Sequence, residues 1–263
     1  MRVALVSDMH GNLVAFEAVL ADLESRRVDR SICLGDVAAF GPQPAETIAR
    51  LRELGWPVVM GNADELLFVD EVPPPENEHE QRLFDLVSWA RDRLAPADVE
   101  FLRSFEPTVK VSLGDGAEVL CFHGSPTSHS ERLLPTTPDD ELARILLPHR
   151  ADVMACGHTH LQMLRRVRDF LLVNAGSVGL PAESIPSDPS PRAQTDEPLA
   201  PWAEYAIVDY ENSSVAVELR RVPVDRDAVA RSGRESGMPH VDWAYGLDRR
   251  ITGRNRAESK TTP

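Results

Sequence analysis

The sequence contains no long apolar run. No segment approaches the roughly 20 consecutive apolar residues that a membrane-spanning helix requires. The apolar run near the start, residues 3–6, is too short for the core of a signal peptide. We therefore expect no membrane association and no secretion, and we expect a cytoplasmic protein.

Cysteine is also scarce, and the three cysteines lie inside apolar segments and not at the regular spacing of a disulfide scaffold: Cys33, Cys121 and Cys156. This placement predicts reduced thiols in a reducing compartment. Free cysteine is often buried, which favours a packing role for all three. Because Cys121 and Cys156 each stand two residues before a histidine that is a candidate metal ligand, a role beside the metal site or in redox sensitivity is the alternative.

Basic side chains are few compared with acidic ones. Lys and Arg total 28 and Asp and Glu total 42, so the formal net charge is -14. Broad nonspecific binding of nucleic acid depends on basic surface and is therefore not expected. A small phosphate ester is compatible with this charge, because metal ions dominate the field of a metal-containing pocket.

Apolar segments alternate between strand and helix patterns along most of the 263 residues, a length that suits one α/β unit. Strands are predicted at residues 2–7, 32–34, 57–60, 108–113, 117–122, 152–156, 161–167, 170–173, 205–210 and 214–221, and helices at 12–26, 44–54 and 139–147. This alternation predicts an α/β protein with a parallel or mixed sheet covered on both faces. Ligands are expected at the carboxyl ends of the strands.

Residues 63–106 and 181–201 depart from this alternation. The first segment is predominantly helical, and we expect either a cap that shapes access to a site or an element packed on the flank of the sheet. The second holds six of the 21 prolines, which predicts an irregular loop.

The C-terminal segment, residues 225–263, loses apolar periodicity and carries eight basic and six acidic side chains. Either Trp243, Tyr245 and Leu247 dock this tail on the body or on a second subunit of a homo-oligomer, or the tail is partly disordered. The main domain is accordingly expected to span residues 1–224.

Seven polar residues follow the predicted strands in five short motifs: Asp8-Met9-His10, Gly35-Asp36, Gly61-Asn62, His123-Gly124 and Gly157-His158-Thr159-His160. In a locally extended segment, Asp8 and His10 would point the same way and share one cation, and His158 and His160 repeat this spacing. Asp36 offers a carboxylate that is able to bridge two metals. Each motif alone is weak, since an isolated Asp-x-His pair is usually a surface accident; together, at strand ends, they predict a metal site.

The ligand types indicate which cations this site would bind. Mixed imidazole, carboxylate and amide ligands suit Mn, Fe, Ni, Co or Zn better than Ca or Mg, and we favour manganese. In a site with two divalent ions, a bridging hydroxide forms readily and attacks a phosphoryl group in line.

The five motifs and their order resemble the calcineurin-like metallophosphoesterase superfamily over about residues 2–218. Three segments are most similar to its compact prokaryotic phosphodiesterase branch: Gly35-Asp36-Val37-Ala38-Ala39-Phe40-Gly41-Pro42, His123-Gly124-Ser125-Pro126 and Asn174-Ala175-Gly176-Ser177-Val178-Gly179. The resemblance implies a four-layer α-β-β-α sandwich of two mixed sheets with a helical insertion, and a dinuclear metal centre.

The resemblance also implies a division of the ligands between the two metals. One metal would be held by Asp8, His10, Asp36 and His160. The other would be held by Asp36, Asn62, His123 and His158. Asn62 and His123 would in addition contact the substrate.

The sequence departs from this superfamily at two functional positions. Its protein Ser/Thr phosphatases carry Val-Asp-Arg-Gly after Gly-Asp and Gly-Asn-His-Glu at the third motif, whereas here Ala63-Asp64 follows Asn62. The arginine that grips a phosphomonoester and the histidine that protonates the leaving group are both missing. Asp64 is expected to cap the following helix. His79 and His129 are candidate proton donors or ordinary surface histidines, so the catalytic acid is unassigned.

Three functions are compatible with these observations. The leading prediction is a phosphodiesterase for small diesters such as cyclic nucleotides, because the loss of a general acid matters less when the leaving group is good. The second is hydrolysis of phosphomonoesters or nucleotide phosphoanhydrides. The third is a noncatalytic metal-binding scaffold subunit, although such a scaffold would have no physical need for all seven ligands.

Overall fold

The computed structural model describes residues 1–70, 74–182 and 199–246. Residues 183–198 of the expected irregular loop and the tail from Leu247 onward lie outside the described residues. Within the part of the chain that is described, no helix has both the length and the apolar character needed to cross a membrane.

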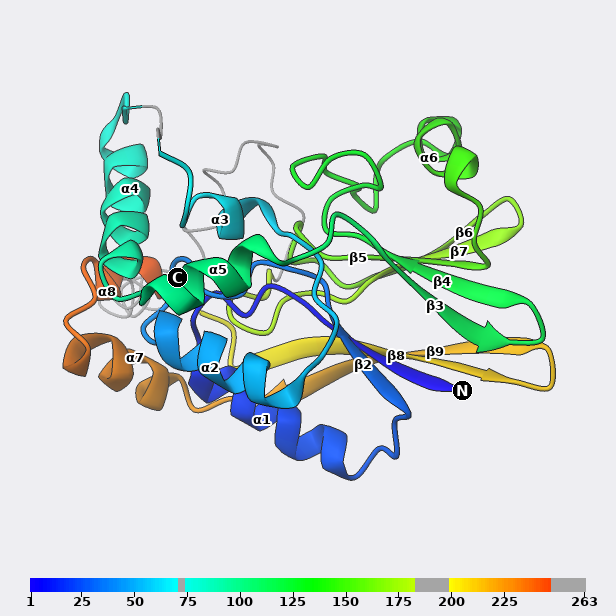
Figure 1. Ribbon diagram of the computed structural model, residues 1–263, viewed down its shortest axis with the longest axis horizontal. Coiled ribbons are helices and arrows are strands. Elements are labelled where there is room, and N and C mark those ends of the chain that lie inside the picture. The colour runs from blue at the N-terminus through cyan, green and yellow to red at the C-terminus, as the bar shows by residue number, and fades with distance from the viewer. Residues whose placement is uncertain (71–73, 183–198, 247–263) are drawn as a thin grey trace, which may run out of the picture.

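Two β-sheets face each other (Figure 1). The first has the order β2-β1-β8-β9, with β1 (Arg2–Val6), β2 (Arg30–Cys33), β8 (Trp202–Glu211) and β9 (Ser214–Pro223). The second has the order β3-β4-β5-β7-β6, with β3 (Val109–Gly114), β4 (Ala117–Cys121), β5 (Val153–Cys156), β6 (Met163–Val167) and β7 (Phe170–Asn174). Both contain parallel and antiparallel pairs, which confirms the prediction of mixed sheets.

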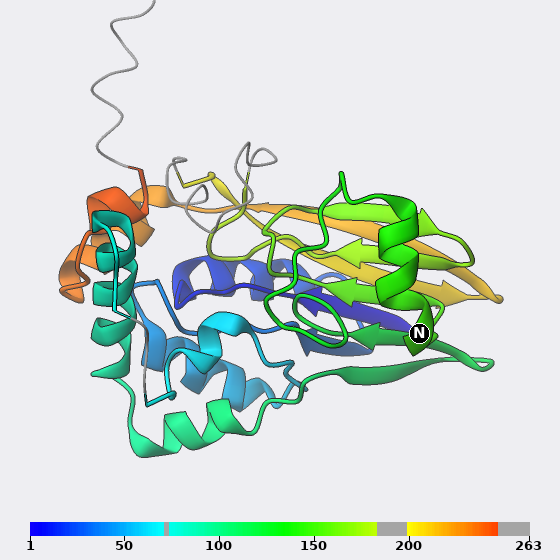
Figure 2. The same cartoon turned by 90° about the horizontal axis from the view of Figure 1, so that it is seen from above.

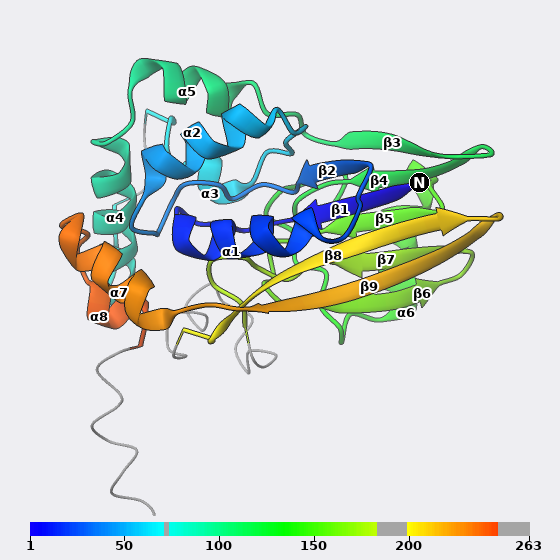
Figure 3. The same ribbon diagram turned by 90° about the horizontal axis from the view of Figure 1, so that it is seen from below.

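Helices cover the outer faces of both sheets. Helices α1 (Leu13–Glu24) and α2 (Pro44–Leu54) lie against the first sheet (Figure 3), and α6 (Asp139–Leu146), followed by the short 3-10 helix η1 (Leu147–His149), lies against the second (Figure 2). Asn12 begins α1, where its side chain accepts a hydrogen bond from the backbone NH of Ala15 at 3.1 Å. The layers are therefore helix, sheet, sheet and helix, as the resemblance implied.

Alternating side chains on the strands fill the three interfaces between these layers. Val6 packs toward α1, whereas the preceding Leu5 lies in the cluster between the sheets. Likewise Val119 faces the first sheet and Leu120 packs toward α6. Neighbouring residues on a strand point to opposite faces, so these buried runs supply two cores at once.

The cysteines are packing residues of these cores. Cys121 lies between the sheets, Cys156 packs toward α6 and Cys33 packs toward α1 and α2. All three are buried and free, and burial raises the pKa of the Cys121 thiol to about 12. Cys121 and Cys156 thus occupy different layers.

Five further helices lie near one end of the sandwich, beyond the carboxyl ends of β1 and β5. They are α3 (Asn62–Glu65), α4 (Glu78–Arg91), α5 (Pro96–Arg103), α7 (Arg226–Glu235) and α8 (Val241–Ala244). Figures 2 and 3 show α4, α7 and α8 grouped together there. Leu86 of α4, Val229 of α7 and Tyr245 after α8 belong to one buried cluster, so the C-terminal helices pack on the helical segment.

The predicted strand at residues 57–60 does not form. Only two isolated bridges are present, Cys33 with Val58 and Val59 with Glu106, in place of a continuous ladder. The backbone NH of Met60 donates to Glu106 O at 2.8 Å, and Gly61 then caps the N-terminus of α3, which begins at Asn62. The segment pairs briefly on two sides because the chain turns before a ladder can extend.

Glu204 is a buried carboxyl group that connects β8 to the loop after β7. Its backbone NH donates to Ser177 O at 2.9 Å, and its Oε1 accepts from Trp202 Nε1 at 3.1 Å and Arg221 Nε at 2.9 Å. Burial raises the pKa of Glu204 to about 7, although Arg221 opposes this shift. A proton is thus held on Glu204 more tightly in the folded chain than in the unfolded one.

We predict that Glu204→Gln reduces the pH dependence of stability. Between the unfolded pKa of 4.5 and the folded pKa of about 7, the folded state binds more protons, so the free energy of unfolding falls as the pH rises. Glutamine is neutral throughout and should recover about 1–3 kcal/mol at pH 8 relative to pH 5 in urea denaturation. Glu211→Gln, at the exposed end of β8, is the control. Identical pH slopes for wild type and Glu204→Gln would contradict the prediction.

Candidate metal centre

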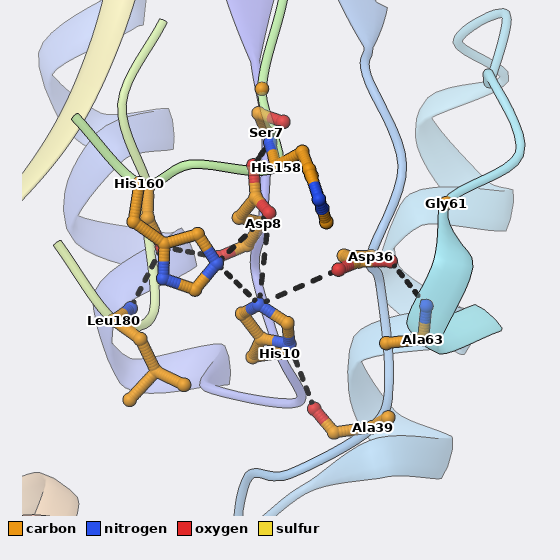
Figure 4. Close-up of polar contacts among 12 residues, drawn as sticks. Ser7, Asp8, His10, Asp36, Ala39, Gly61, Ala63, His158, His160 and Leu180 are labelled. Atoms are coloured by element: carbon orange, nitrogen blue, oxygen red, sulfur yellow. Dashed lines mark hydrogen bonds and ion pairs between the residues drawn. The ribbon is translucent and has the colours of Figure 1, made fainter. Parts of the chain in front are cut away.

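All seven predicted residues come together at the carboxyl ends of the strands. Asp8 and His10 follow β1, Asp36 follows β2, His123 follows β4, His158 and His160 follow β5, and Asn62 begins α3. The two sheets thus contribute side chains to one cluster. Figure 4 shows Asp8, His10, Asp36, His158 and His160 directed toward a common centre.

One group of the cluster consists of Asp8, His10 and His160. Asp8 Oδ1 lies 3.1 Å from His160 Nε2 and 3.7 Å from His10 Nε2, and the two imidazole nitrogens are 3.0 Å apart. These three ligand atoms lie within 4.8 Å of one another, close enough to share one ion.

A second group lies on the other side of the two carboxylates. His123 Nε2 is 3.3 Å from Asp36 Oδ2, 3.1 Å from Asn62 Oδ1 and 4.0 Å from Asp8 Oδ1. Asp36 Oδ2 is also 3.8 Å from His10 Nε2. The His158 ring lies 5.2 Å from that of His123, between centroids. The two carboxylates therefore lie between two sets of imidazoles.

Each carboxylate has one oxygen held by the protein and one directed into the cluster. Asp8 Oδ2 accepts from Ser7 Oγ and from the backbone NH of His158, and Asp36 Oδ1 accepts from the backbone NH of Ala63 at 2.8 Å. Asp8 Oδ1 is buried with no hydrogen-bond partner among the described residues, although three imidazole nitrogens lie within 4.0 Å. A buried oxygen left without a donor is costly. A cation between the carboxylate and the imidazoles would satisfy both, so the residues present fit divalent metal.

Two of the histidines are oriented by backbone carbonyl groups. His10 Nδ1 donates to Ala39 O at 3.1 Å, and His123 Nδ1 donates to Leu34 O at 2.7 Å. In that tautomer, each Nε2 carries a lone pair that faces the carboxylates. Hydrogen bonds of this kind fix the ring and the tautomer of metal-binding histidines.

Five of the seven residues have a left-handed backbone: Asp8 (φ 56), His10 (φ 48), Asp36 (φ 56), His158 (φ 65) and His160 (φ 58). The prediction that the Asp-x-His and His-x-His pairs are locally extended was therefore wrong. Their side chains converge through tight turns instead. Positive φ is uncommon for residues other than glycine, and such strained positions cluster at functional sites.

Two glycines allow the backbone to pack directly against the carboxylates. A Cβ atom on Gly157 would lie 1.9 Å from Ser7 Oγ and 2.5 Å from Asp8 Oδ2. A Cβ atom on Gly61 would lie 2.1 Å from Asp36 Oδ1. Glycine at these two positions therefore lets the backbone lie close to both carboxylates.

The opposed charges of the cluster shift its pKa values in opposite directions. Burial alone would raise the pKa of Asp36, but His123 outweighs it and lowers the pKa to about 2. Burial alone would lower the pKa of His123, but Asp36 and Asp8 outweigh it and raise the pKa to about 10. Burial and the neighbouring His123 lower the pKa of His158 to about 4. In the absence of metal, the His123 ring therefore holds a second proton and is positively charged at neutral pH.

Asp64 does more than the sequence predicted. It is not the residue that precedes α3 but lies inside that helix, and its carboxylate accepts from the backbone NH of Gly61 at 3.1 Å. The same carboxylate accepts from the NH groups of Asp36 at 2.8 Å and Val37 at 2.7 Å. Asp64 thus fixes the turn that presents Asp36, a tertiary role that capping preference alone does not indicate.

Ala63 contributes through its backbone and not through its side chain. Its NH donates to Asp36, while its methyl group is fully buried in the core beneath α3. Neither candidate for the missing acid lines the cavity at the cluster. The His79 ring packs edge-on against Trp243, and His129 Nε2 lies 3.0 Å from Glu65 Oε2 beside a different hollow.

A cavity of about 380 Å³ opens onto the cluster. We call the polar residues of its lining that belong to the cluster the metal-facing wall: His10, Asp36, Asn62, His158 and His160. We call the large apolar residues of its lining the apolar wall: Phe40, Leu83, Leu86, Leu180 and Trp243. Arg132 and Ser130 also line the cavity. Arg132 has no motif around it, so sequence reasoning missed it.

Comparisons with known proteins show what this chain is similar to. The model of the calcineurin-like phosphoesterase superfamily domain matches residues 1–190. An uncharacterized protein of Methanocaldococcus jannaschii is 26% identical over 200 residues, which cover 70% of this chain and 78% of that protein.

Two crystal structures are similar over 93% of this chain and 97% of their own chains. A metallophosphoesterase from Sphaerobacter thermophilus is 25% identical with a TM-score of 0.68. A hypothetical protein from Pyrococcus horikoshii OT3 is 19% identical with a TM-score of 0.75, and it shows a shared fold.

We predict that Ala63→His destabilises the protein without placing an imidazole in the cavity. The methyl group is fully buried, and overpacking of a core typically costs about 1–3 kcal/mol. Urea denaturation measures this loss, and Ala97→His on the exposed surface of α5 is the matched control. Unchanged stability together with faster cleavage of diesters with poor leaving groups would show instead that the new imidazole reaches the substrate.

We predict that the binding of a divalent cation at the cluster releases protons and weakens as the pH falls. A cation must displace the proton from His123, whose pKa in the metal-free protein is about 10. One displaced proton makes the affinity about tenfold weaker at pH 6.5 than at pH 7.5. Isothermal titration calorimetry in buffers of different ionisation enthalpy counts the protons. His129→Gln, outside the cluster, should keep this dependence, and metal binding without proton release would refute the prediction.

Proposed function

Because this chain belongs to the calcineurin-like phosphoesterase superfamily, and is a metal-dependent phosphoric ester hydrolase, we propose that it is a dinuclear phosphodiesterase acting on small diesters such as cyclic nucleotides. The observation that carries the proposal is the pair of carboxylate oxygens, Asp8 Oδ1 and Asp36 Oδ2, that face two sets of imidazoles. Such an arrangement suits two cations close together.

The proposed ligands divide into two sets. One metal would be held by Asp8, His10, Asp36 and His160, and the other by Asp36, Asn62, His123 and His158. Asp36 belongs to both sets, because its Oδ2 lies 3.8 Å from His10 Nε2 and 3.3 Å from His123 Nε2. Manganese is the favoured metal for this mixture of ligands.

Bound divalent ions would supply positive charge for the phosphoryl oxygens and a hydroxide at neutral pH. The chain itself provides position. Asp64 fixes the turn of Asp36, and the carbonyl groups of Ala39 and Leu34 orient His10 and His123. We propose that Asn62 and His123 also contact the substrate, as the resemblance implied.

The surroundings of the cluster favour a diester over a phosphomonoester. The turn after Asp36 contributes Phe40 to the cavity and carries no basic side chain between Val37 and Gly41. A diester bears one negative charge and a monoester up to two, so less positive charge is required. Arg132 is the observation that favours the alternative, hydrolysis of monoesters or nucleotide phosphoanhydrides, because this basic residue lines the same cavity.

The leaving group must depart without an acid at position 63, whose side chain is buried in the core. General acid help is typically worth 10²- to 10⁴-fold, so we propose that the natural substrate has a stable leaving group. The noncatalytic scaffold has no specific observation in its favour.

The domain boundaries are also part of the proposal. We propose that residues 1–224 form the hydrolase domain and that residues 63–106 act as a cap, since α4 contributes Leu83 and Leu86 to the cavity. Trp243 and Ala244 also line it, so the C-terminal segment takes part in the site.

A cytoplasmic location is proposed from the three free, buried cysteines.

We predict that the purified protein hydrolyses bis-aryl phosphate faster than aryl phosphate in the presence of manganese, and that Asp36→Asn lowers kcat by at least about 10²-fold. The amide keeps the shape of the carboxylate but removes the charge that the cations require. Assays with each candidate metal and with cyclic nucleotides measure this preference.

The matched control is Asp98→Asn. Asp98 is likewise buried and accepts from a backbone NH, that of Ala95 at 3.0 Å, but it lies on α5 away from the cluster. Equal turnover of Asp36→Asn and wild type would refute the proposed site. Preference for aryl phosphate or for nucleotide anhydrides would select the alternative function.

A further inference from the structure

We propose that the apolar wall of the cavity binds a planar aromatic ring of the substrate, as in a nucleoside base, while its phosphate lies at the metal-facing wall. This inference rests on the proposed function and specifies its substrate class. It assigns Phe40 and Trp243 as residues that determine specificity.

The lining of the cavity combines two kinds of chemistry. Its metal-facing wall carries carboxylate, amide and imidazole groups, whereas the apolar wall presents two aromatic and three leucine side chains. A ligand that fills this space therefore needs a charged end and an apolar end. A volume of about 380 Å³ suits one small molecule.

Trp243 is held in place before any ligand binds. The His79 ring packs edge-on against it with centroids 5.4 Å apart, and the guanidinium carbon of Arg82 lies 5.3 Å from the centroid of its ring. Helix α8 is itself anchored by Val241 and Tyr245 in the buried cluster with Leu86. A preorganised aromatic ring loses little conformational freedom on binding, which favours stacking.

Phe40 is directed toward the cavity by an unusual backbone. Its φ is 76, a left-handed conformation that is a genuine outlier for a bulky residue. The neighbouring Gly41 packs so closely on the chain that a Cβ atom there would lie 1.7 Å from His10 O. The Phe40 ring lies 5.7 Å from the His10 ring, between centroids. The turn therefore places an aromatic ring beside a proposed metal ligand at the cost of backbone strain.

A planar ring fits these observations better than an alkyl chain. Aromatic side chains stack on the faces of bases largely irrespective of sequence, and every base offers such a face. Arg132 is a basic residue of the same lining, which suits a ligand that carries a phosphate. An alkyl phosphate would use the leucines but gain nothing from the two aromatic rings.

The experiment compares binding of adenosine 5′-monophosphate with that of ribose 5-phosphate to the manganese-loaded chain of 263 residues. The two probes share sugar and phosphate and differ in the base. Stacking of one base predicts that the nucleotide binds about tenfold more tightly. Isothermal titration calorimetry measures both affinities, and n-hexyl phosphate tests for an aliphatic preference.

Trp243→Leu keeps an apolar side chain but removes the ring, so it should reduce the tenfold difference to less than about twofold. Trp243→Phe should retain most of the difference. The matched control is Trp202→Leu, because Trp202 is also half-buried under an arginine, with the guanidinium carbon of Arg221 4.6 Å from its ring centroid, but does not line the cavity.

Tryptophan fluorescence gives a second readout that needs no catalysis. The nucleotide should quench the emission of wild type and Trp202→Leu, and this quenching should be lost in Trp243→Phe. Equal affinities for the two sugar phosphates, tighter binding of n-hexyl phosphate, or equal effects of Trp243→Leu and Trp202→Leu would overturn the inference.

The same experiment separates this inference from the proposed function. If the nucleotide binds through Trp243 but no diester is hydrolysed in the presence of any metal, the aromatic site is supported and the proposed phosphodiesterase function is overturned. If diesters are hydrolysed but a ring brings no preference, the phosphodiesterase function is supported and the aromatic site is overturned.

Discussion

The burial of two carboxylates beside one another is the constraint on which the site depends. Asp8 and Asp36 lie in the interior at strand ends, where like charges repel and water does not compensate them. Each uses one oxygen to accept hydrogen bonds from the chain and leaves the other facing imidazoles. The surrounding features serve this arrangement: the glycines admit backbone NH groups, and Asp64 holds the turn of Asp36. Only positive charge at the centre, from protons or metal ions, completes it.

The two sheets contribute to this centre in a complementary way. The first sheet delivers Asp8, His10 and Asp36, and the second delivers His123, His158 and His160, so the site exists only where the layers are correctly stacked. Near the site, Glu204 helps to hold the two sheets in their relative position, because it is buried and joins β8 to the loop after β7. Folding of the sandwich and formation of the metal site are therefore one process.

The sequence predicted which residues would meet but not the conformations in which they meet. The motifs follow apolar strands, and strand ends at one edge of a sheet are neighbours, so the convergence of Asp8, Asp36 and His158 could be inferred. Local spacing suggested extended Asp-x-His, whereas the hydrogen bonds of the packed layers select left-handed turns. The role of Asp64 and the presence of Arg132 and Trp243 in the cavity depend on contacts between segments far apart in the chain, which carry no local pattern.

The two walls of the cavity come from different parts of the chain. Strand ends build the metal-facing wall, whereas α4 and α8 provide much of the apolar wall and are joined to each other by the cluster of Leu86 and Tyr245. The metal-facing wall and the apolar wall are thus formed by separate parts of the chain. If the two walls have the roles proposed for them, a substitution in the apolar wall would change which molecules fit and would leave the metal ligands as they are.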